Sequence, residues 1–423
     1  MGTKLRMGVA ITVQPDGRLS AAMDSPDQGA YGLPLSDVTF ADRVLKFALT
    51  AAKGTFEGKL NDAGTEITGT WKQMLSLPLV LKRVEKLARP NRPQEPKPPF
   101  PYRSEDVTVT NAAGKSVLAG TLTLPPGQGR APAVVLISGS GLQNRDEELM
   151  GHKPFLVLAD YLTRHGIAVL RYDDRGAGKS TGNAADATSE DFAGDALAAW
   201  QYLRTRREID PRRVGFLGHS EGGLIAPMLA ARTPGVAFIV MLAGPGVPGD
   251  EIMLKQSARI MKAGGAPDSA IAANANLQKQ VFAILREETD TARITERLNA
   301  IPVPGRPEAK AGLVKQSLSP WLRYFVRYDP VPALTKVTCP VLALNGELDT
   351  QVDADQNLPA IEAALKKSGN KDFTVTRLPG LNHLLQTCKT GLPAEYVKIE
   401  ETMSPAALDM MASWIVKRTG LVK

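Results

Sequence analysis

Residues 214–223 read VGFLGHSEGG, and this stretch decides how the rest of the chain is interpreted. The apolar run 214–217 predicts a buried strand, and the residues after the motif predict a helix. A serine in the pattern Gly-x-Ser-x-Gly between a strand and a helix stands on a sharp turn with its hydroxyl exposed. Gly218 and Gly222 suit such a turn, because they carry no Cβ to clash with neighbouring backbone. The stretch predicts Ser220 as a nucleophile, the alternative being a glycine-rich turn that this serine caps.

A serine hydroxyl is a weak nucleophile at neutral pH and needs a general base. The chain has four histidines. His219 adjoins the nucleophile and is expected to point elsewhere. His165 ends a predicted helix and suits a capping role, while His152 either lines the pocket or lies on the surface. His383 follows the predicted strand 373–378 through a Pro-Gly loop, which is where a base is expected.

The base in turn needs a carboxylate that sets its tautomer and stabilises its charged form. The predicted strand 341–344 runs into the loop NGELD, which ends at Asp349. Asp349 is therefore the first choice for the acid, and Asp353 and Glu347 are held in reserve.

Acyl transfer also requires N–H groups that are placed in advance around the developing oxyanion. One donor is expected to be the backbone amide of Glu221, the residue after the nucleophile. The other is expected in the glycine-rich loop 138–146, which follows a predicted strand. Ser140 is the first choice there, with Gly141 or Leu142 as alternatives.

Short apolar runs alternate with helical stretches over most of the chain. The runs predict buried parallel strands at 133–137, 167–170, 214–217, 238–242 and 341–344. Helices are predicted at 191–206 and 222–232. This alternation predicts a doubly wound, mostly parallel α/β sheet. It is interrupted at about 248–330 by a stretch with helical periodicity, which we interpret as a lid over the sheet or, alternatively, as outer helices remote from the chemistry.

A proline-rich segment, 88–102, separates this region from the N-terminal part, because proline at this density blocks both helices and sheet ladders. Residues 1–87 show short alternating strands, for example at 56–60 and 67–71, which a turn-forming loop joins. The sequence thus predicts a small antiparallel β domain, as an open barrel or a sandwich, at 1–87, a linker at 88–102 and a catalytic α/β domain at 103–423.

Composition excludes several other classes of protein. The net charge is +7 with basic and acidic residues interleaved, so no nucleic-acid partner is expected. No apolar run is long enough to predict a membrane span.

Two cysteines cannot build a disulfide framework, and the usual zinc motifs are absent from the sequence, so no metal is expected. The Gly-Lys-Ser at 178–180 lacks the upstream glycine of a P-loop, and no cofactor is expected.

Together these motifs resemble the α/β-hydrolase superfamily over about 107–422, near its bacterial serine esterases of the serine aminopeptidase-like and cinnamoyl-esterase-like kind. The stretches that carry the resemblance are GSGLQNRDEEL, RYDDRGAGKSTG, GFLGHSEGG, LNGELDTQVD and LPGLNHLLQT. It implies Ser220 as nucleophile, Asp349 as acid and His383 as base, in the chain order of that superfamily. It implies oxyanion donors at Ser140 and Glu221, although a Ser-Gly pair stands where the family usually has His-Gly.

The first hypothesis for function is a serine carboxylesterase that acts on a small-molecule ester through an acyl-enzyme. Aminopeptidase or thioesterase activity with the same triad is a second hypothesis. A third is a non-catalytic protein that binds lipid or carbohydrate through the β domain. The resemblance implies export to the periplasm or medium by a signal outside this chain, with a cytoplasmic location as the alternative. The sequence leaves the oligomeric state undetermined.

Overall fold

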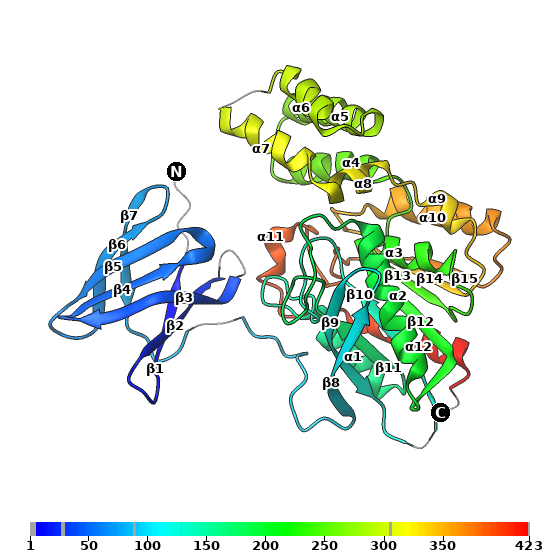
Figure 1. The fold of residues 1–423 in the computed structure, drawn as a ribbon, viewed down its shortest axis with the longest axis horizontal. Helices are drawn as coiled ribbons and strands as arrows, with labels where there is room; N and C mark the ends of the chain where they lie inside the picture. Colours follow the sequence, from blue (N-terminus) through cyan, green and yellow to red (C-terminus); the bar gives the residue numbers. More distant parts are fainter. Residues whose placement is uncertain (1–5, 27–29, 88–89, 128, 304–306, 422–423) are drawn as a thin grey trace. The chain divides into compact units, whose positions relative to one another are not determined.

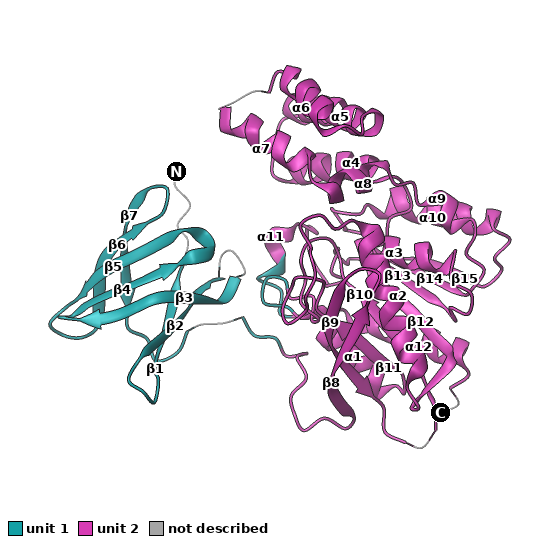
Figure 2. Ribbon diagram, in the orientation of Figure 1, with its two compact units in different colours: residues 1–92, 149–152, 396–400 teal, residues 93–148, 153–395, 401–423 magenta. Residues whose placement is uncertain are grey.

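The computed structural model describes residues 6–26, 30–87, 90–127, 129–303 and 307–421. Figure 2 shows the two compact units into which the chain divides. Unit 1 comprises residues 1–92, 149–152 and 396–400, and unit 2 comprises residues 93–148, 153–395 and 401–423. Residues 88–89, where the predicted linker begins, lie outside the described residues. The domain limits drawn from the sequence stay a prediction.

Unit 1 is a seven-stranded antiparallel sheet in which each strand pairs with the next along the chain. Its strands are β1 (Gly8–Val13), β2 (Leu19–Ser25), β3 (Ala30–Ala41), β4 (Val44–Leu49), β5 (Gly54–Leu60), β6 (Glu66–Lys72) and β7 (Ser76–Lys82), and a 3₁₀ turn, η2 (Thr50–Ala52), follows β4. The all-β prediction is confirmed. Among the described residues the strands form one meander, in which β3 pairs with both β2 and β4.

The core of unit 1 comes from the alternating pattern of its strands. Leu45, Phe47 and Leu49 of β4 are buried, while Lys46 between them is exposed. Phe47 stacks on Phe56 of β5, with ring centroids 5.0 Å apart. Side chains on one face of the sheet therefore bury each other, as the period of two along a strand requires.

Unit 2 is built on an eight-stranded sheet in the order β15-β14-β13-β12-β10-β11-β9-β8. Its strands are β8 (Arg103–Asn111), β9 (Ser116–Leu124), β10 (Ala131–Ile137), β11 (Ala168–Tyr172), β12 (Ile209–His219), β13 (Ile239–Leu242), β14 (Val341–Gly346) and β15 (Phe373–Leu378). The strands from β10 to β15 pair in parallel, and β8 and β9 are antiparallel. The mostly parallel sheet is thus confirmed.

Helices cover both faces of this sheet (Figure 1). Val134 and Leu136 of β10 pack in the cluster that holds α1 (Pro154–Arg164) and α12 (Pro405–Thr419). Val135 belongs to the opposite cluster, with α2 (Ser189–Thr205), α3 (Glu221–Ala230) and α10 (Ala354–Lys367). Burial on both faces explains why the strands of this sheet are continuous apolar runs.

The sheet order reverses beside β10, since β11 lies on one side of it and β12 on the other. In open α/β sheets this switch point lies where loops from the carboxyl ends of neighbouring strands diverge and leave a crevice. The loop after β10 and the turn after β12 therefore meet at the place where a ligand site is expected.

The interruption predicted at 248–330 is a group of helices with a core of its own, in which Phe282, Leu285, Leu298 and Val326 are buried. The helices are α4 (Gly249–Ala263), α5 (Asp268–Glu287), α6 (Thr291–Ala300), α7 (Pro307–Ser317) and α8 (Pro320–Arg327). The described residues also include two one-turn helices, α9 (Val331–Leu334) and α11 (Pro393–Tyr396). Among the described residues, no helix is both long and apolar enough to cross a bilayer.

Candidate active site

Ser220 stands on the turn between β12, which ends at His219, and α3, which begins at Glu221. Its φ is 52° and its ψ is −115°, a backbone region that costs a non-glycine residue about 1–3 kcal/mol. Its backbone amide donates to Leu242 O at 2.8 Å, which fixes the turn to the neighbouring strand β13. A Cβ at Gly218 would stand 1.9 Å from Gly222 O, so the close turn requires glycine there.

Asp349 and His383 lie together after the ends of the neighbouring parallel strands β14 and β15. His383 Nδ1 is 2.8 Å from Asp349 Oδ2, and both residues are buried. The other carboxylate oxygen of Asp349 accepts from the backbone amides of Gln351 and Val352 at 2.7 and 2.9 Å. Three hydrogen bonds therefore hold this carboxylate in one orientation, with one oxygen aimed at His383.

The reserve carboxylates have other partners. Asp353 caps α10, where its side chain accepts from the amide of Gln356. Glu347 accepts from the amide of Gly380 at 3.1 Å. Asp349 is thus the carboxylate of the three that contacts His383.

The remaining histidines fall into three different environments. His165 caps the end of α1, as predicted, with Nδ1 2.8 Å from Tyr161 O. His152 is buried, so neither predicted place for it is right, and burial lowers its pKa to about 4. His219 turns its ring to other partners than Ser220: its Nε2 lies 3.0 Å from the backbone oxygen of His383.

The loop after β10 lies against Ser220. A Cβ at Gly139 would be 3.2 Å from the Cβ of Ser220, so only a small residue fits. The amide of Gly139 already donates to Glu147 Oε1 at 2.7 Å. Among the residues that the structure describes, the amides of Ser140 and Glu221 have no hydrogen-bond acceptor. The two predicted oxyanion donors are therefore unengaged, and Glu221 opens the helix that directly follows Ser220.

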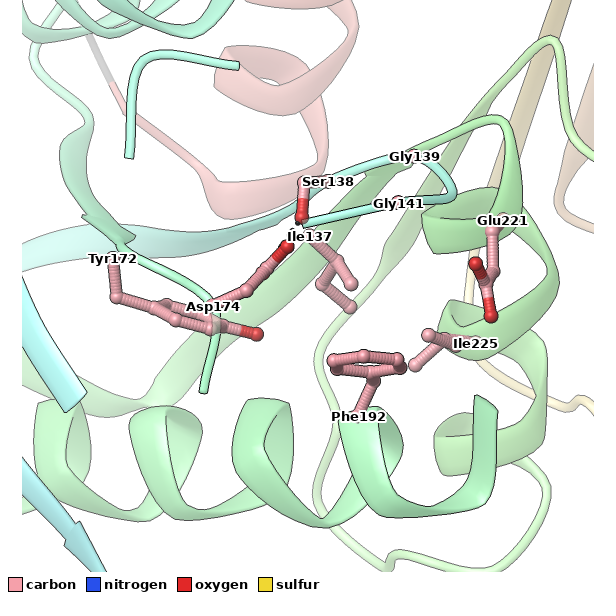
Figure 3. A pocket seen from close by; sticks show the side chains of 9 residues that line it. All are labelled: Ile137, Ser138, Gly139, Gly141, Tyr172, Asp174, Phe192, Glu221 and Ile225. Carbon is pink, nitrogen blue, oxygen red and sulfur yellow. Dashed lines mark hydrogen bonds between the residues drawn. The ribbon is translucent and has the colours of Figure 1, made fainter. Parts of the chain in front are cut away.

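A cavity adjoins these elements, and Figure 3 shows the carboxylates of Asp174 and Glu221 on two sides of it. It is lined by Ile137, Ser138, Gly139, Gly141, Tyr172, Asp174, Phe192, Glu221 and Ile225. Glu221 accepts from Ser189 Oγ at 2.5 Å and from Trp321 Nε1 at 2.8 Å. Burial raises the pKa of Glu221, although both hydrogen bonds act against that shift.

Asp174 follows β11 and points into the same cavity (Figure 3). It accepts from the amide of Gln143 and from Ser138 Oγ, each at 2.9 Å. Burial raises the pKa of Asp174 to about 8, against the effect of these hydrogen bonds. The next residue, Arg175, turns its guanidinium away to Asp195, with Nε donating to Oδ2 at 2.7 Å.

We expect Asp174→Asn to stabilise the protein at neutral and alkaline pH. The unfolded carboxyl ionises near its ordinary pKa of 3.8, whereas the folded one ionises only near 8. The wild type should therefore lose stability relative to the variant as the pH rises from about 4 to about 8, by more than about 1 kcal/mol in total. The asparagine can keep both contacts, since its oxygen accepts from Gln143 and the Ser138 hydroxyl can accept from its amide.

Urea unfolding of both proteins at several pH values measures this difference. A stability difference that stays constant between about pH 4 and pH 8 would contradict the assignment of a raised pKa to Asp174.

Within the described part of the chain, no cluster of three or more histidine, cysteine, aspartate or glutamate side chains is placed to hold a metal ion. The sequence missed two participants at the site, Glu147 and Asp174. Glu147 belongs to no motif recognised in the sequence. The burial of Asp174 depends on segments that are far apart in the chain and meet only in the folded structure.

The chain is similar to known hydrolases. The family model of serine aminopeptidase, S33, matches residues 153–293. The esterase EstD of Thermotoga maritima is 29% identical over 324 residues, which is 75% of this chain and 69% of that protein. An uncharacterised protein of Mycobacterium tuberculosis is 32% identical over 112 residues, 26% of this chain and 36% of that protein.

Solved structures are also similar to this chain. An esterase of Pyrococcus furiosus has a TM-score of 0.47 at 19% identity, over 79% of this chain and 99% of that one. A puromycin-hydrolysing peptidase of Mycobacterium tuberculosis has a TM-score of 0.46 at 14% identity, over 97% of this chain and 54% of that one.

The sheet order of unit 2, the turn around Ser220 and the similarity to a bacterial esterase over most of the chain agree with one another. Unit 2 has the doubly wound, mostly parallel sheet of an α/β-hydrolase fold, a small all-β unit precedes it in the chain, and the chain is similar to serine aminopeptidase-like hydrolases and to a bacterial esterase.

Proposed function

We propose that the protein is a serine hydrolase that cleaves carboxylic esters through Ser220, His383 and Asp349. The observation that carries this proposal is the buried 2.8 Å contact between His383 and Asp349, together with the strained turn at Ser220. His219, the neighbour of Ser220 in the chain, contacts the backbone of His383. The proposed nucleophile, acid and base follow the carboxyl ends of β12, β14 and β15, three strands of the same sheet.

In this mechanism Ser220 Oγ attacks the ester carbonyl carbon and gives its proton to His383 Nε2. Nε2 is the nitrogen left for this task, because Nδ1 faces Asp349. The amides of Glu221 and Ser140 donate to the oxyanion. The alcohol leaves with the proton from His383, and an acyl-enzyme remains. Water, deprotonated by His383, then attacks the acyl carbon and releases the acid and the free serine.

The helical group α4–α8 acts as a lid in this proposal, and the catalytic domain extends over the predicted range 103–423. Trp321 of α8 supports the lid role, because its indole N–H reaches Glu221, the residue after the nucleophile. Trp321 also stacks on Phe325, with centroids 5.2 Å apart. In this proposal the aromatic pair, held against the Glu221 side chain by Trp321, limits the length of the acyl group that fits.

We expect hydrolysis of p-nitrophenyl esters to favour short acyl chains sharply. Trp321→Ala should shift the preferred acyl length upward, because it removes the ring next to Glu221. Trp321→Phe is the control, since it keeps one aromatic ring that can stack on Phe325 and loses the hydrogen bond of the indole N–H. The measurement is kcat/KM against acyl length for the three proteins. Rates no higher than those of Ser220→Ala at every length would contradict the esterase proposal.

A second candidate is the hydrolysis of peptides or aminoacyl amides by the same triad. The observation that favours it is the Glu221 carboxylate on the cavity wall, one residue from the nucleophile, where it can bind a substrate ammonium group. Aminoacyl p-nitroanilides should then be cleaved faster than the matching esters lacking the amine. Faster cleavage of the esters favours the first candidate.

A further inference from the structure

Both ring nitrogens of His219 face hydrogen-bond acceptors. Nδ1 lies 2.9 Å from Glu147 Oε1, and Nε2 lies 3.0 Å from the backbone oxygen of His383. A carbonyl oxygen accepts and never donates, so Nε2 must carry a proton to form its bond. A neutral imidazole has only one N–H, whereas an imidazolium has two. The surroundings of His219 therefore match the doubly protonated ring.

The charges around His219 favour this form. Burial alone would lower the pKa of His219, but the adjacent Glu147 carboxylate, the bond to His383 O and the nearby Asp349 raise it above the ordinary value. The ring of His383 also packs against His219, with centroids 4.7 Å apart. Glu147 is itself buried, so the pair is screened from solvent.

The pair connects three separate parts of the site. Glu147 Oε1 accepts from both His219 and the amide of Gly139, in the loop after β10. His219 is the last residue of β12, and its other nitrogen reaches the loop after β15 that carries His383. The Glu147 carboxylate and the His219 ring thus connect three segments by hydrogen bonds: the loop after β10, the turn that carries Ser220, and the backbone of His383.

We propose that His219 is an imidazolium that, with Glu147, positions His383 and the loop 138–141 against Ser220. This role rests on the proposed function, because His383 is the base there. His219 is a positioning residue, since the atoms it contacts belong to the protein. Loss of the Nε2 proton would turn a lone pair toward His383 O, and the resulting repulsion would displace the backbone of the base.

The direct test is the protonation state of His219 in the full-length protein. Four histidines make ¹⁵N-histidine labelling practical, and His219→Gln assigns the signal. The spectra are recorded on the Ser220→Ala protein, so that the observed protonation state of His219 does not depend on turnover. The proposal predicts two N–H groups on His219 at about pH 7, and loss of one of them in Glu147→Gln. A neutral ring at that pH would overturn it.

Kinetics provide the second test. His219→Leu should lower kcat by about 100-fold, the typical effect of a misplaced catalytic group, with little change in KM. His219→Gln should recover part of this loss, because its amide can donate to His383 O. The wild-type rate should also fall as the pH rises through the pKa of His219, and this fall should be absent in His219→Gln, whose amide does not titrate.

His165→Gln is the matched control and should keep the wild-type kcat, because that ring bonds only within its own helix end. A folded His219→Leu protein with wild-type kcat would overturn the positioning role. Two measurements distinguish this outcome from failure of the proposed function. If the proposed function is wrong, Ser220→Ala retains turnover, whereas the two N–H signals of His219 do not depend on that result.

Discussion

Replacing Ser220 with alanine should lower ester turnover by on the order of 10⁶-fold and leave the fold intact. The loss is large because the attacking atom itself is removed. Cys388 is no substitute nucleophile, since burial raises the pKa of its thiol and so keeps it protonated. Among the described residues Ser220 Oγ makes no hydrogen bond, so its removal breaks no structural contact.

The measurement is kcat/KM on a p-nitrophenyl ester, with circular dichroism and thermal unfolding as checks on the fold. Ser368→Ala is the matched control, because its hydroxyl bonds to Leu365 O at the end of α10, away from the turn. The control should keep the wild-type rate. Turnover by Ser220→Ala within tenfold of wild type would remove Ser220 from the mechanism.

Replacing Asp349 with asparagine should lower turnover by on the order of 10⁴-fold, through the tautomer of His383. One oxygen of Asp349 accepts from the amides of Gln351 and Val352, so the asparagine must place its oxygen there. Its NH₂ group then faces His383 Nδ1 and donates to it. The ring proton moves to Nε2, and the nitrogen that should take the proton of Ser220 is already occupied.

Asp353→Asn is the control for this variant. Asparagine caps a helix as well as aspartate does, so α10 should be unaffected. The variant also loses the ion pair between Asp353 and Arg259 of α4, and its rate should stay close to wild type. Equal losses in the two variants would mean that Asp349 acts through local structure. A wild-type rate in Asp349→Asn would exclude it as the acid.

Much of the fold of unit 2 could be predicted because its signals are local. Strand 373–378 matches β15 residue for residue, and the interruption at 248–330 matches helices α4–α8. The turn at Ser220 was recognisable because glycines stand where a Cβ would meet backbone. Asp349 and His383 followed from the rule that loops from neighbouring parallel strands meet at one edge of the sheet.

The parts that were missed depend on long-range contacts. Glu147 and His219 are separated by 72 positions in the chain, and nothing in either segment indicates that they pair. His152 is buried by residues distant in sequence, and its contact with Tyr396 O spans 244 positions. In unit 1, β3 was not predicted, because it contains Pro34 and a bulge between Ser36 and Thr39 that break the alternating pattern.

The most direct test of the account is covalent labelling with a fluorophosphonate, which reacts with a serine that is activated as a nucleophile. The wild-type protein should take up one label per chain, and peptide mapping should place it on Ser220. His383→Ala should react far more slowly, and Ser220→Ala should not react. A label on another residue, or none on a protein that still hydrolyses esters, would contradict the central claim. Absence of both label and hydrolysis would favour a non-catalytic binding protein.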